Sequence, residues 1–151
     1  MEKLNEDLLD AWLKLSTTVV NNRIVSELSF NESLVCNILY KKLVENDCET
    51  VTATYLCKET KILKSQMNRI LNQLESKNII VRERSTEDKR QVHVKMNQDH
   101  LCKYKNQHAN ILRIVDLIIE RIGTENTIHM VENLNVISEL VDQMIEANKE
   151  K

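Results

Sequence analysis

Proline is absent from the sequence, and glycine occurs once, at Gly123, among 151 residues. Soluble proteins average roughly 7% glycine and 5% proline, and both residues are common in tight turns. Their scarcity argues against a turn-rich β fold and favours helices. The length suits one domain with a sizeable core, so we expect a single domain over residues 1–151.

Long apolar runs are missing too. No segment approaches the ~18 uninterrupted apolar residues of a membrane span, and the acidic first residues contain no apolar run of signal-peptide length. We therefore expect a cytoplasmic protein without a membrane partner. The four cysteines, Cys36, Cys48, Cys57 and Cys102, have no CxxC spacing, which in a reducing cytosol indicates free thiols.

Signatures of catalysis are also lacking. The sequence has no glycine-rich phosphate loop, no nucleophile elbow and no evident carboxylate or Cys/His pair placed for acid–base chemistry. We therefore predict no enzyme activity, no cofactor and no resident metal.

Charged residues are divided unevenly along the chain. The formal net charge is −2, but residues 58–95 carry ten basic and five acidic side chains. This local charge of +5 leaves −7 for the rest of the chain. Such segregation indicates a basic patch that meets a polyanion.

Apolar residues recur at helical spacing through most of the chain. We expect a helix over about residues 2–22, a second that begins near its N-cap Asn31, and a short third capped by Thr52. A fourth should begin at Lys64 and end at Asn78, because asparagine tolerates the left-handed conformation beyond a helix end. This fourth helix should bury Met67, Ile70, Leu71 and Leu74.

Alternation replaces helical spacing after Asn78, which predicts a two-stranded hairpin with a charged tip. One face of the hairpin should be apolar and the other wet. The apolar face is expected to hold Ile79, Val81, Val92, Val94 and Met96, and the wet face Arg82, Arg84, Gln91, His93 and Lys95.

Two longer helices are expected in the C-terminal third. Asn97 can cap the first, while Gly123 and Thr124 mark its end and the start of the second. Both present more apolar surface than a small monomer leaves in water, which indicates a homodimer. The first carries a heptad seam that consists of Leu101, Tyr104, His108, Ile111, Val115, Ile118 and Ile122.

Two short helices joined by a tight turn and followed by a hairpin describe a winged helix-turn-helix. The predicted fold is therefore mostly α with a small β-hairpin wing. In this architecture the second helix of the pair enters the major groove of double-stranded DNA. The outward face of the fourth helix has no acid before Glu75 and is rich in side chains that bond base edges. Its predicted DNA-binding residues are Lys64, Ser65, Gln66, Asn68, Arg69 and Asn72.

The hairpin supplies the second part of the predicted DNA interface. Lys89 and Arg90 at its tip, with Arg82 and Arg84 on the strand below, can reach phosphates or the minor groove. Asp88 is expected to orient Arg90 or Arg82 through a charge-assisted hydrogen bond.

Residues 52–97 resemble the core of the MarR family of bacterial transcription regulators. The stretch contains a capped short helix, a K-S-x-x-x-R recognition helix, the segment "LESKNIIVR" and a wing that ends in D-x-R. Asn78 stands where Gly is usual in the family, and Lys89 where Arg is common. The matching positions are Lys64, Ser65, Arg69, Leu74, Glu75, Lys77, Ile80, Arg82, Asp88 and Arg90.

The resemblance implies an obligate homodimer that binds an inverted-repeat operator with half-sites about one helical turn apart. The winged helix-turn-helix lobe would span residues 31–97, flanked by dimerisation helices over 1–24 and 98–148. Family members often release DNA when a small phenolic or amphipathic effector binds between the lobes. We predict a repressor, because the chain offers no separate surface for recruiting polymerase.

Other interpretations stay open at this point. A thiol switch could use Cys48 or Cys102, the second of which lies near His100 and Lys103, and a zinc site could use His100, Cys102 and His108. A winged helix can also serve as a protein-interaction module without binding DNA. Such binding would depend weakly on salt, whereas DNA binding weakens steeply as salt rises.

Overall fold

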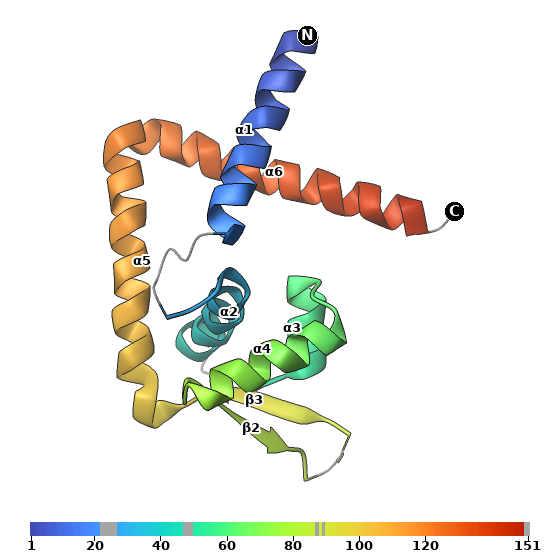
Figure 1. Ribbon diagram of the computed structural model, residues 1–151, viewed down its shortest axis with the longest axis vertical. Helices are drawn as coiled ribbons and strands as arrows, with labels where there is room; N and C mark the ends of the chain where they lie inside the picture. Colours follow the sequence, from blue (N-terminus) through green and yellow to red (C-terminus); the bar gives the residue numbers. More distant parts are fainter. Residues whose placement is uncertain (22–26, 47–49, 87, 89, 150–151) are drawn as a thin grey trace. The chain divides into compact units, whose positions relative to one another are not determined.

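The computed structural model describes residues 1–21, 27–46, 50–86, 88 and 90–149. Figure 1 shows a mostly helical chain with a small sheet, as the sequence predicts. The chain forms two compact units, residues 1–108 and residues 109–151. The helices of the first unit are α1 (Glu2–Asn21), α2 (Phe30–Asn46), α3 (Ala53–Thr60), α4 (Lys64–Ser76) and the short η1 (Gln98–His100), and its strands are β1 (Val51–Thr52), β2 (Ile80–Arg84) and β3 (Val92–Met96). Helix α5 (Leu101–Ile122) begins in the first unit and continues into the second, which also contains α6 (Thr124–Lys149).

Helix α2 begins at Phe30, and its cap is Ser29 rather than the predicted Asn31. The Ser29 hydroxyl accepts a hydrogen bond from the Glu32 N–H at 3.3 Å, and the Glu32 carboxylate accepts one from the Ser29 N–H at 2.7 Å. This reciprocal pair is a capping box, which satisfies two N–H groups at the helix start. Asn31 has the chemistry of a cap but lies inside the first turn.

Helices α3 and α4 form the helix-turn-helix pair. Thr52 caps α3, as predicted, by accepting a hydrogen bond from the Tyr55 N–H at 3.1 Å. Lys61 takes a left-handed conformation (φ 58°) where α3 ends, and the chain turns into α4. Asn78 is also left-handed (φ 58°) just beyond α4, which confirms the predicted helix end.

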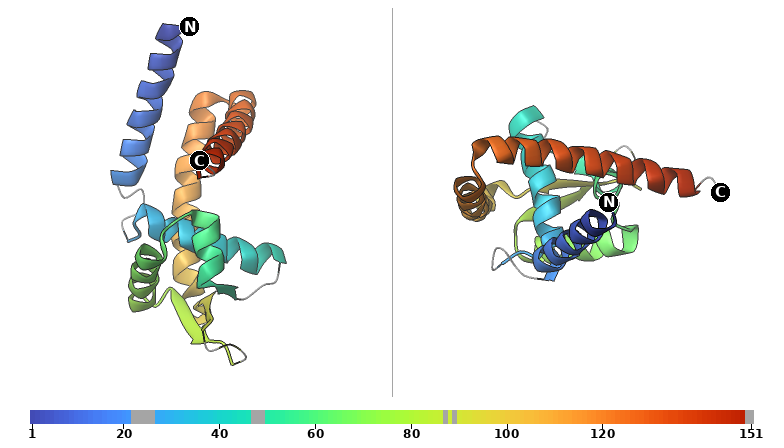
Figure 2. Two further views of the ribbon diagram at one scale, coloured as in Figure 1. Left: turned by 90° about the vertical axis from the view of Figure 1, so that its right-hand side faces the viewer. Right: turned by 90° about the horizontal axis from the view of Figure 1, so that it is seen from above.

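The sheet has three strands in the order β1-β3-β2, so the predicted two-stranded ribbon was one strand short. Strand β1 adds a two-residue antiparallel pairing, Val51 with Val94 and Thr52 with His93. A strand this short leaves no alternation in the sequence to recognise. In Figure 1 the β2–β3 hairpin projects from the helices, and Figure 2 shows the same projection from another direction.

The two faces of β2 are the reverse of the prediction. Arg82 pairs with Val94, whereas Val81 pairs with Lys95. Residues opposite each other across an antiparallel pair point to the same side of the sheet. Arg82 therefore lies on the side of Val94, which is fully buried, and Val81 lies on the other side.

This reversal is caused by two consecutive buried side chains, Ile79 and Ile80, which are 3% and 1% exposed. Strict alternation would bury only one of them. Ile79 fills the core from the turn before the strand, and alternation starts at Ile80, so Arg82 and Arg84 fall on the side of Ile80.

A single apolar core joins α2, α3, α4, the sheet and the start of α5 within the first unit. Helix α4 contributes the four residues that its spacing predicts, Met67, Ile70, Leu71 and Leu74, each at most 3% exposed. Burying side chains of this size contributes ~1.5–3 kcal/mol each to stability. This buried face fixes which side of α4 points to solvent. The core also contains Leu28, Val35, Cys36, Leu39, Val51, Leu56, Ile79, Ile80, Val94, Met96 and Tyr104.

The remaining helices leave their apolar side chains in solvent. In the described parts of α1, of α5 beyond residue 108 and of α6, no residue is buried. The predicted seam of α5 is therefore divided, because Tyr104 is 2% exposed whereas Val115 and Ile118 are 39% and 42% exposed. Gly123 (φ 89°) separates α5 from α6, as predicted. Within the described ranges, none of the helices has the length and apolar character needed to cross a membrane.

Candidate nucleic-acid interface

The outward face of α4 is polar and open to solvent. It is opposite the buried Met67 and Leu74 along the helix, and the first turn contains no acid. Nothing on α4 before Glu75 would therefore repel a phosphate. Of the predicted residues on this helix, Lys64, Ser65, Asn68, Arg69 and Asn72 are exposed, and Gln66 is half-buried.

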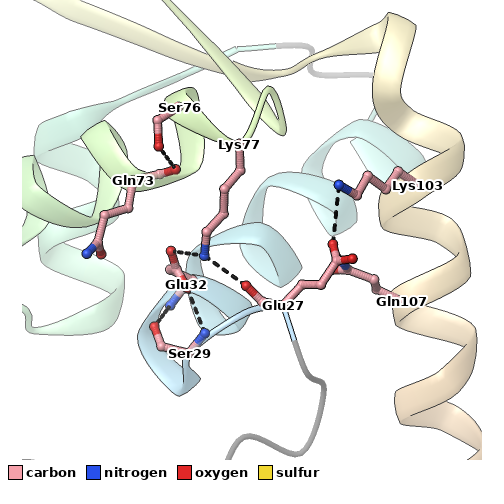
Figure 3. A network of polar contacts seen from close by, with 8 residues as sticks. All are labelled: Glu27, Ser29, Glu32, Gln73, Ser76, Lys77, Lys103 and Gln107. Carbon is pink, nitrogen blue, oxygen red and sulfur yellow. Dashed lines mark hydrogen bonds and ion pairs between the residues drawn. The ribbon is translucent and has the colours of Figure 1, made fainter.

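An ion pair fastens the C-terminal end of α4 to α2. The Lys77 ammonium lies 2.7 Å from Glu32 Oε1 and donates to the Glu27 carbonyl oxygen at 2.8 Å (Figure 3). The Glu32 side chain is only 3% exposed. Burial raises the pKa of Glu32, but the hydrogen bond and charge of Lys77, together with hydrogen bonding by Ser29, outweigh burial and lower the pKa overall. The pair thus keeps a buried carboxylate ionised.

Glu27 extends the same network to the first turns of α5. Gln107 Nε2 donates to Glu27 Oε2 at 2.7 Å, and the Lys103 ammonium lies 3.3 Å from the same oxygen (Figure 3). Through Lys77, this network joins the end of α4 to the segment before α2 and to α5. The orientation of α4 is therefore set by polar contacts at its end as well as by its buried face.

Arg82 connects the wing to α4. Its Nε donates to Glu75 Oε2 at 3.0 Å, and its Nη2 donates to the same oxygen. The hydrogen bond from Arg82 lowers the pKa of the Glu75 carboxyl, and the guanidinium charge acts in the same direction. Because the two side chains are 25% and 40% exposed, the pair adds little to global stability. Its effect is local, since it links β2 to α4.

Asp88 shapes the wing tip through the backbone. Its Oδ1 accepts a hydrogen bond from the Arg90 backbone N–H at 3.0 Å, and its own N–H donates to Ser85 Oγ at 3.1 Å. Of the two partners expected for Asp88, it bonds Arg90, through the backbone N–H, whereas the Arg82 guanidinium bonds Glu75. Lys89, the other predicted tip residue, lies outside the described residues.

A groove of about 490 Å³ lies between the start of α3, α4 and the part of the hairpin toward its tip. Three cationic side chains line it, Lys64, Arg82 and Arg90, and no acidic side chain does so among the described residues. Cations gathered in a concave surface suit an anionic partner such as a phosphate. The remaining lining residues are Thr52, Ala53, Thr54, Cys57, Met67, Asn68, Leu71, Gln91 and Val92.

Four predicted residues meet in this groove: Lys64, Asn68, Arg82 and Arg90. Ser65, Gln66, Arg69, Asn72 and Arg84 lie outside it, on the outward side of α4 and on the exposed end of β2.

Sequence reasoning assigned no DNA-binding role to three polar groove residues, Thr52, Thr54 and Gln91. Thr54 lies in the first turn of α3, the helix that crosses the DNA backbone in this architecture, and that position was a usable signal. Alternation predicted Gln91 on the wet face of the hairpin, but its position in the groove depends on how the tip folds back, which alternation does not describe.

The cysteines differ widely in their surroundings. Cys36 is buried, and burial raises its pKa to about 12, so its thiol stays protonated at neutral pH. Cys102 is exposed and Cys57 half-buried. Cys48 lies outside the described residues.

His108 belongs to an aromatic cluster. Its ring centroid lies 5.2 Å from that of Tyr40 and 6.0 Å from that of Tyr104. His100 Nδ1 lies 3.2 Å from Asn97 Nδ2. Across the part of the chain that the structure describes, no three His, Cys, Asp or Glu side chains are grouped to hold a metal ion.

Comparison with known sequences gives a family for most of the first unit. The family described as transcriptional regulator SarA/Rot matches residues 23–107. This range is more than half of the chain and runs from before α2 into α5. Proteins with curated descriptions give no match.

Solved structures of transcription regulators have a similar fold. CouR, a transcriptional repressor bound to a 23-mer DNA duplex, is 20% identical with a TM-score of 0.73 over 89% of this chain and 92% of that one. FabT of Streptococcus pneumoniae in complex with DNA is 19% identical (TM-score 0.64, 95% and 98% covered). BpsR of Bordetella bronchiseptica, whose DNA binding is regulated by 6-hydroxynicotinic acid, is 15% identical (TM-score 0.67, 90% and 98% covered). These similarities establish the winged-helix fold.

Proposed function

The chain belongs to the SarA/Rot family of transcriptional regulators and is of the MarR-like winged-helix type, and we propose that it represses transcription as a homodimer bound to an inverted-repeat DNA operator. The observation that carries this proposal is the outward face of α4, which is exposed, free of acid in its first turn and rich in side chains of the kinds that hydrogen-bond base edges. Such a role belongs in the cytoplasm, where the DNA of a bacterium lies.

In the proposed complex, α4 lies in the major groove. Arg69 suits guanine, and Asn68 and Asn72 suit adenine, because their side chains match the donors and acceptors of those base edges. Lys64, Ser65 and Gln66 lie at the end of α4 that comes nearest the bases in a helix-turn-helix. DNA duplexes bound to CouR and FabT support the same use of the fold here.

The wing is proposed to hold the DNA backbone beside α4. Lys64, Arg82 and Arg90 line one groove, so a phosphate there would face three cations. Arg84 and Lys89 would add contacts along the hairpin, and Asp88 would set the tip conformation through its bond to the Arg90 N–H.

A homodimer is supported by the apolar side chains that the single chain leaves in solvent. On α6, Leu134, Leu140 and Met144 are 49%, 53% and 65% exposed. On α1, Leu8 and Trp12 are 58% and 47% exposed. A surface this apolar fits burial against a second copy. We assign residues 31–97 to the DNA-binding lobe, and 1–24 and 98–148 to dimerisation.

Release from DNA is proposed to follow binding of a small phenolic or amphipathic effector. An effector shifts such an equilibrium only if it binds the released conformation more tightly. Tyr40 and His108, both half-buried with rings 5.2 Å apart, offer an aromatic surface for it. The regulation of BpsR by 6-hydroxynicotinic acid supports an aromatic ligand class.

Selection of bound fragments from random duplexes tests the proposal. We expect an inverted repeat with half-sites roughly 10 bp apart, occupied by two chains in native mass measurements. Enrichment of no duplex, or occupation of an unsymmetrical site by one chain, would contradict it. The selected duplex then serves for a screen of aromatic acids and phenols that release the protein.

A further inference from the structure

Leu63 occupies the N-cap position of α4 and is 74% exposed. Within the described residues between 27 and 100, the other large apolar side chains that are exposed are Phe30 and Val44, at 42% and 63%. Its neighbour Ile62 packs against the core, so the turn had an apolar side chain for the interior without Leu63. Of the three exposed side chains, Leu63 is the most exposed, and the core does not need it.

Leucine is also among the least suitable residues for this position. A serine, threonine, aspartate or asparagine at an N-cap accepts a hydrogen bond from an N–H of the first turn, which leucine cannot do. Leu63 makes no such bond. By contrast, Ser29 and Thr52 cap α2 and α3 with side-chain hydrogen bonds. A residue type that lowers helix stability at an exposed position indicates a function at that position.

The neighbours of Leu63 indicate which partner would cover it. Lys64 and Ser65 follow it directly on the exposed side of α4, and a protein partner would have to bury these polar groups with the leucine. The N-terminal residues of a recognition helix contact base edges in the major groove. Thymine is the base that displays a methyl group there. A leucine has no hydrogen-bonding capacity, so an apolar contact is what it can contribute.

We propose that Leu63 is a specificity-determining residue that packs against the C5-methyl group of a thymine in each half-site. This inference rests on the proposed function, because it requires α4 to lie in the major groove. The leucine gives up capping of the recognition helix in exchange for discrimination at one base pair.

Replacing single thymines by deoxyuridine in the selected operator tests the contact, because this change removes only the methyl group. In each half-site we expect one thymine whose replacement lowers the affinity of the wild-type protein about fourfold. This is the affinity contributed by burying one methyl group. The Leu63→Ser variant should bind the thymine and uracil duplexes equally well. Leu63→Ala should behave in the same way and separates the loss of the leucine from any new contact made by serine.

Thermal unfolding supplies a readout of opposite sign. Leu63→Ser should raise Tm by about 2 to 6 °C, because serine can cap α4, although the same change removes the thymine preference. Val44→Ser is the matched control, because Val44 is similarly exposed but lies near the end of α2. Val44→Ser should leave the affinity difference between the thymine and uracil duplexes unchanged, and that difference should arise at the same thymine as in the wild type.

Three results would overturn the inference: a selected operator without thymine in its half-sites, no methyl effect at any thymine, or a methyl effect that persists in Leu63→Ser. The selection itself separates this failure from failure of the proposed function. If no duplex is enriched at all, the proposed function fails and the inference falls with it.

Discussion

Glu75 near the end of α4 and Arg82 in β2 are joined by two hydrogen bonds from one guanidinium to one carboxylate oxygen. Arg82 also lines the groove beside Lys64 and Arg90. The ion pair therefore holds a cation of the proposed DNA surface in place and ties the wing to α4.

Glu75→Gln should reduce operator affinity several-fold and change stability by less than about 1 kcal/mol, because the pair is partly exposed. The expected loss comes from a less ordered Arg82 that must be fixed when a phosphate binds. Operator titration and chemical denaturation of the same variant give the two values. An increase in affinity would mean that Glu75 holds Arg82 away from DNA.

Lys77→Met should destabilise the protein by about 3 kcal/mol, because it leaves the buried Glu32 carboxylate without its charged partner. Lys58→Met is the control, since Lys58 is exposed on α3 and its loss should cost less than about 0.5 kcal/mol. Urea denaturation of both variants measures the free energy of unfolding. Equal effects would show that the Lys77–Glu32 pair contributes nothing specific.

Acid should remove the contribution of Glu32. Its folded pKa is lowered below the usual value of 4.5, so this contribution is fully present above pH 4.5 and is lost as the pH falls through the folded pKa. The stability gap between wild type and Glu32→Gln should therefore shrink below pH 4.5. Unfolding curves of both proteins at pH 7, 5 and 3.5 measure this stability difference. A difference that grows toward acid pH would contradict the expected role of the Glu32 carboxylate.

Helix α4 and its two faces follow from the sequence because the relevant signals are local. Apolar spacing set the four buried positions of α4, and Asn78 marked its end through a conformation that asparagine tolerates. The predicted cap of α2, Asn31, was wrong because Ser29, two residues earlier, forms a capping box with Glu32.

The groove could not be predicted in the same way. It combines α3, α4 and both sides of the hairpin, Arg82 on β2 and residues 90–92 before and at the start of β3, so its shape depends on contacts between residues distant in sequence. The reversed face of β2 had a similar origin, because Ile79 and Ile80 are both buried by packing that alternation does not describe. The Glu75–Arg82 pair becomes visible only once that face is known.

Leu134→Glu should weaken the proposed dimer, because it places a charge among apolar side chains of α6 that are expected to be buried in the dimer. Asn135→Glu adds the same charge at the next position, which lies with Glu139 and Asp142 on the polar side of the helix. Sedimentation over a range of concentrations should show dissociation of the first variant alone. Two variants with the same mass as the wild type would remove α6 from the interface.

The central claim is that the outward face of α4 reads base pairs, and the affinity of Arg69→Ala for the selected operator and for a scrambled duplex of equal length tests it most directly. The account predicts a loss of about 1 to 3 kcal/mol on the operator and little change on the scrambled duplex, with binding of both weakening steeply as salt rises. Equal losses on the two duplexes, or binding that does not respond to salt, would contradict it.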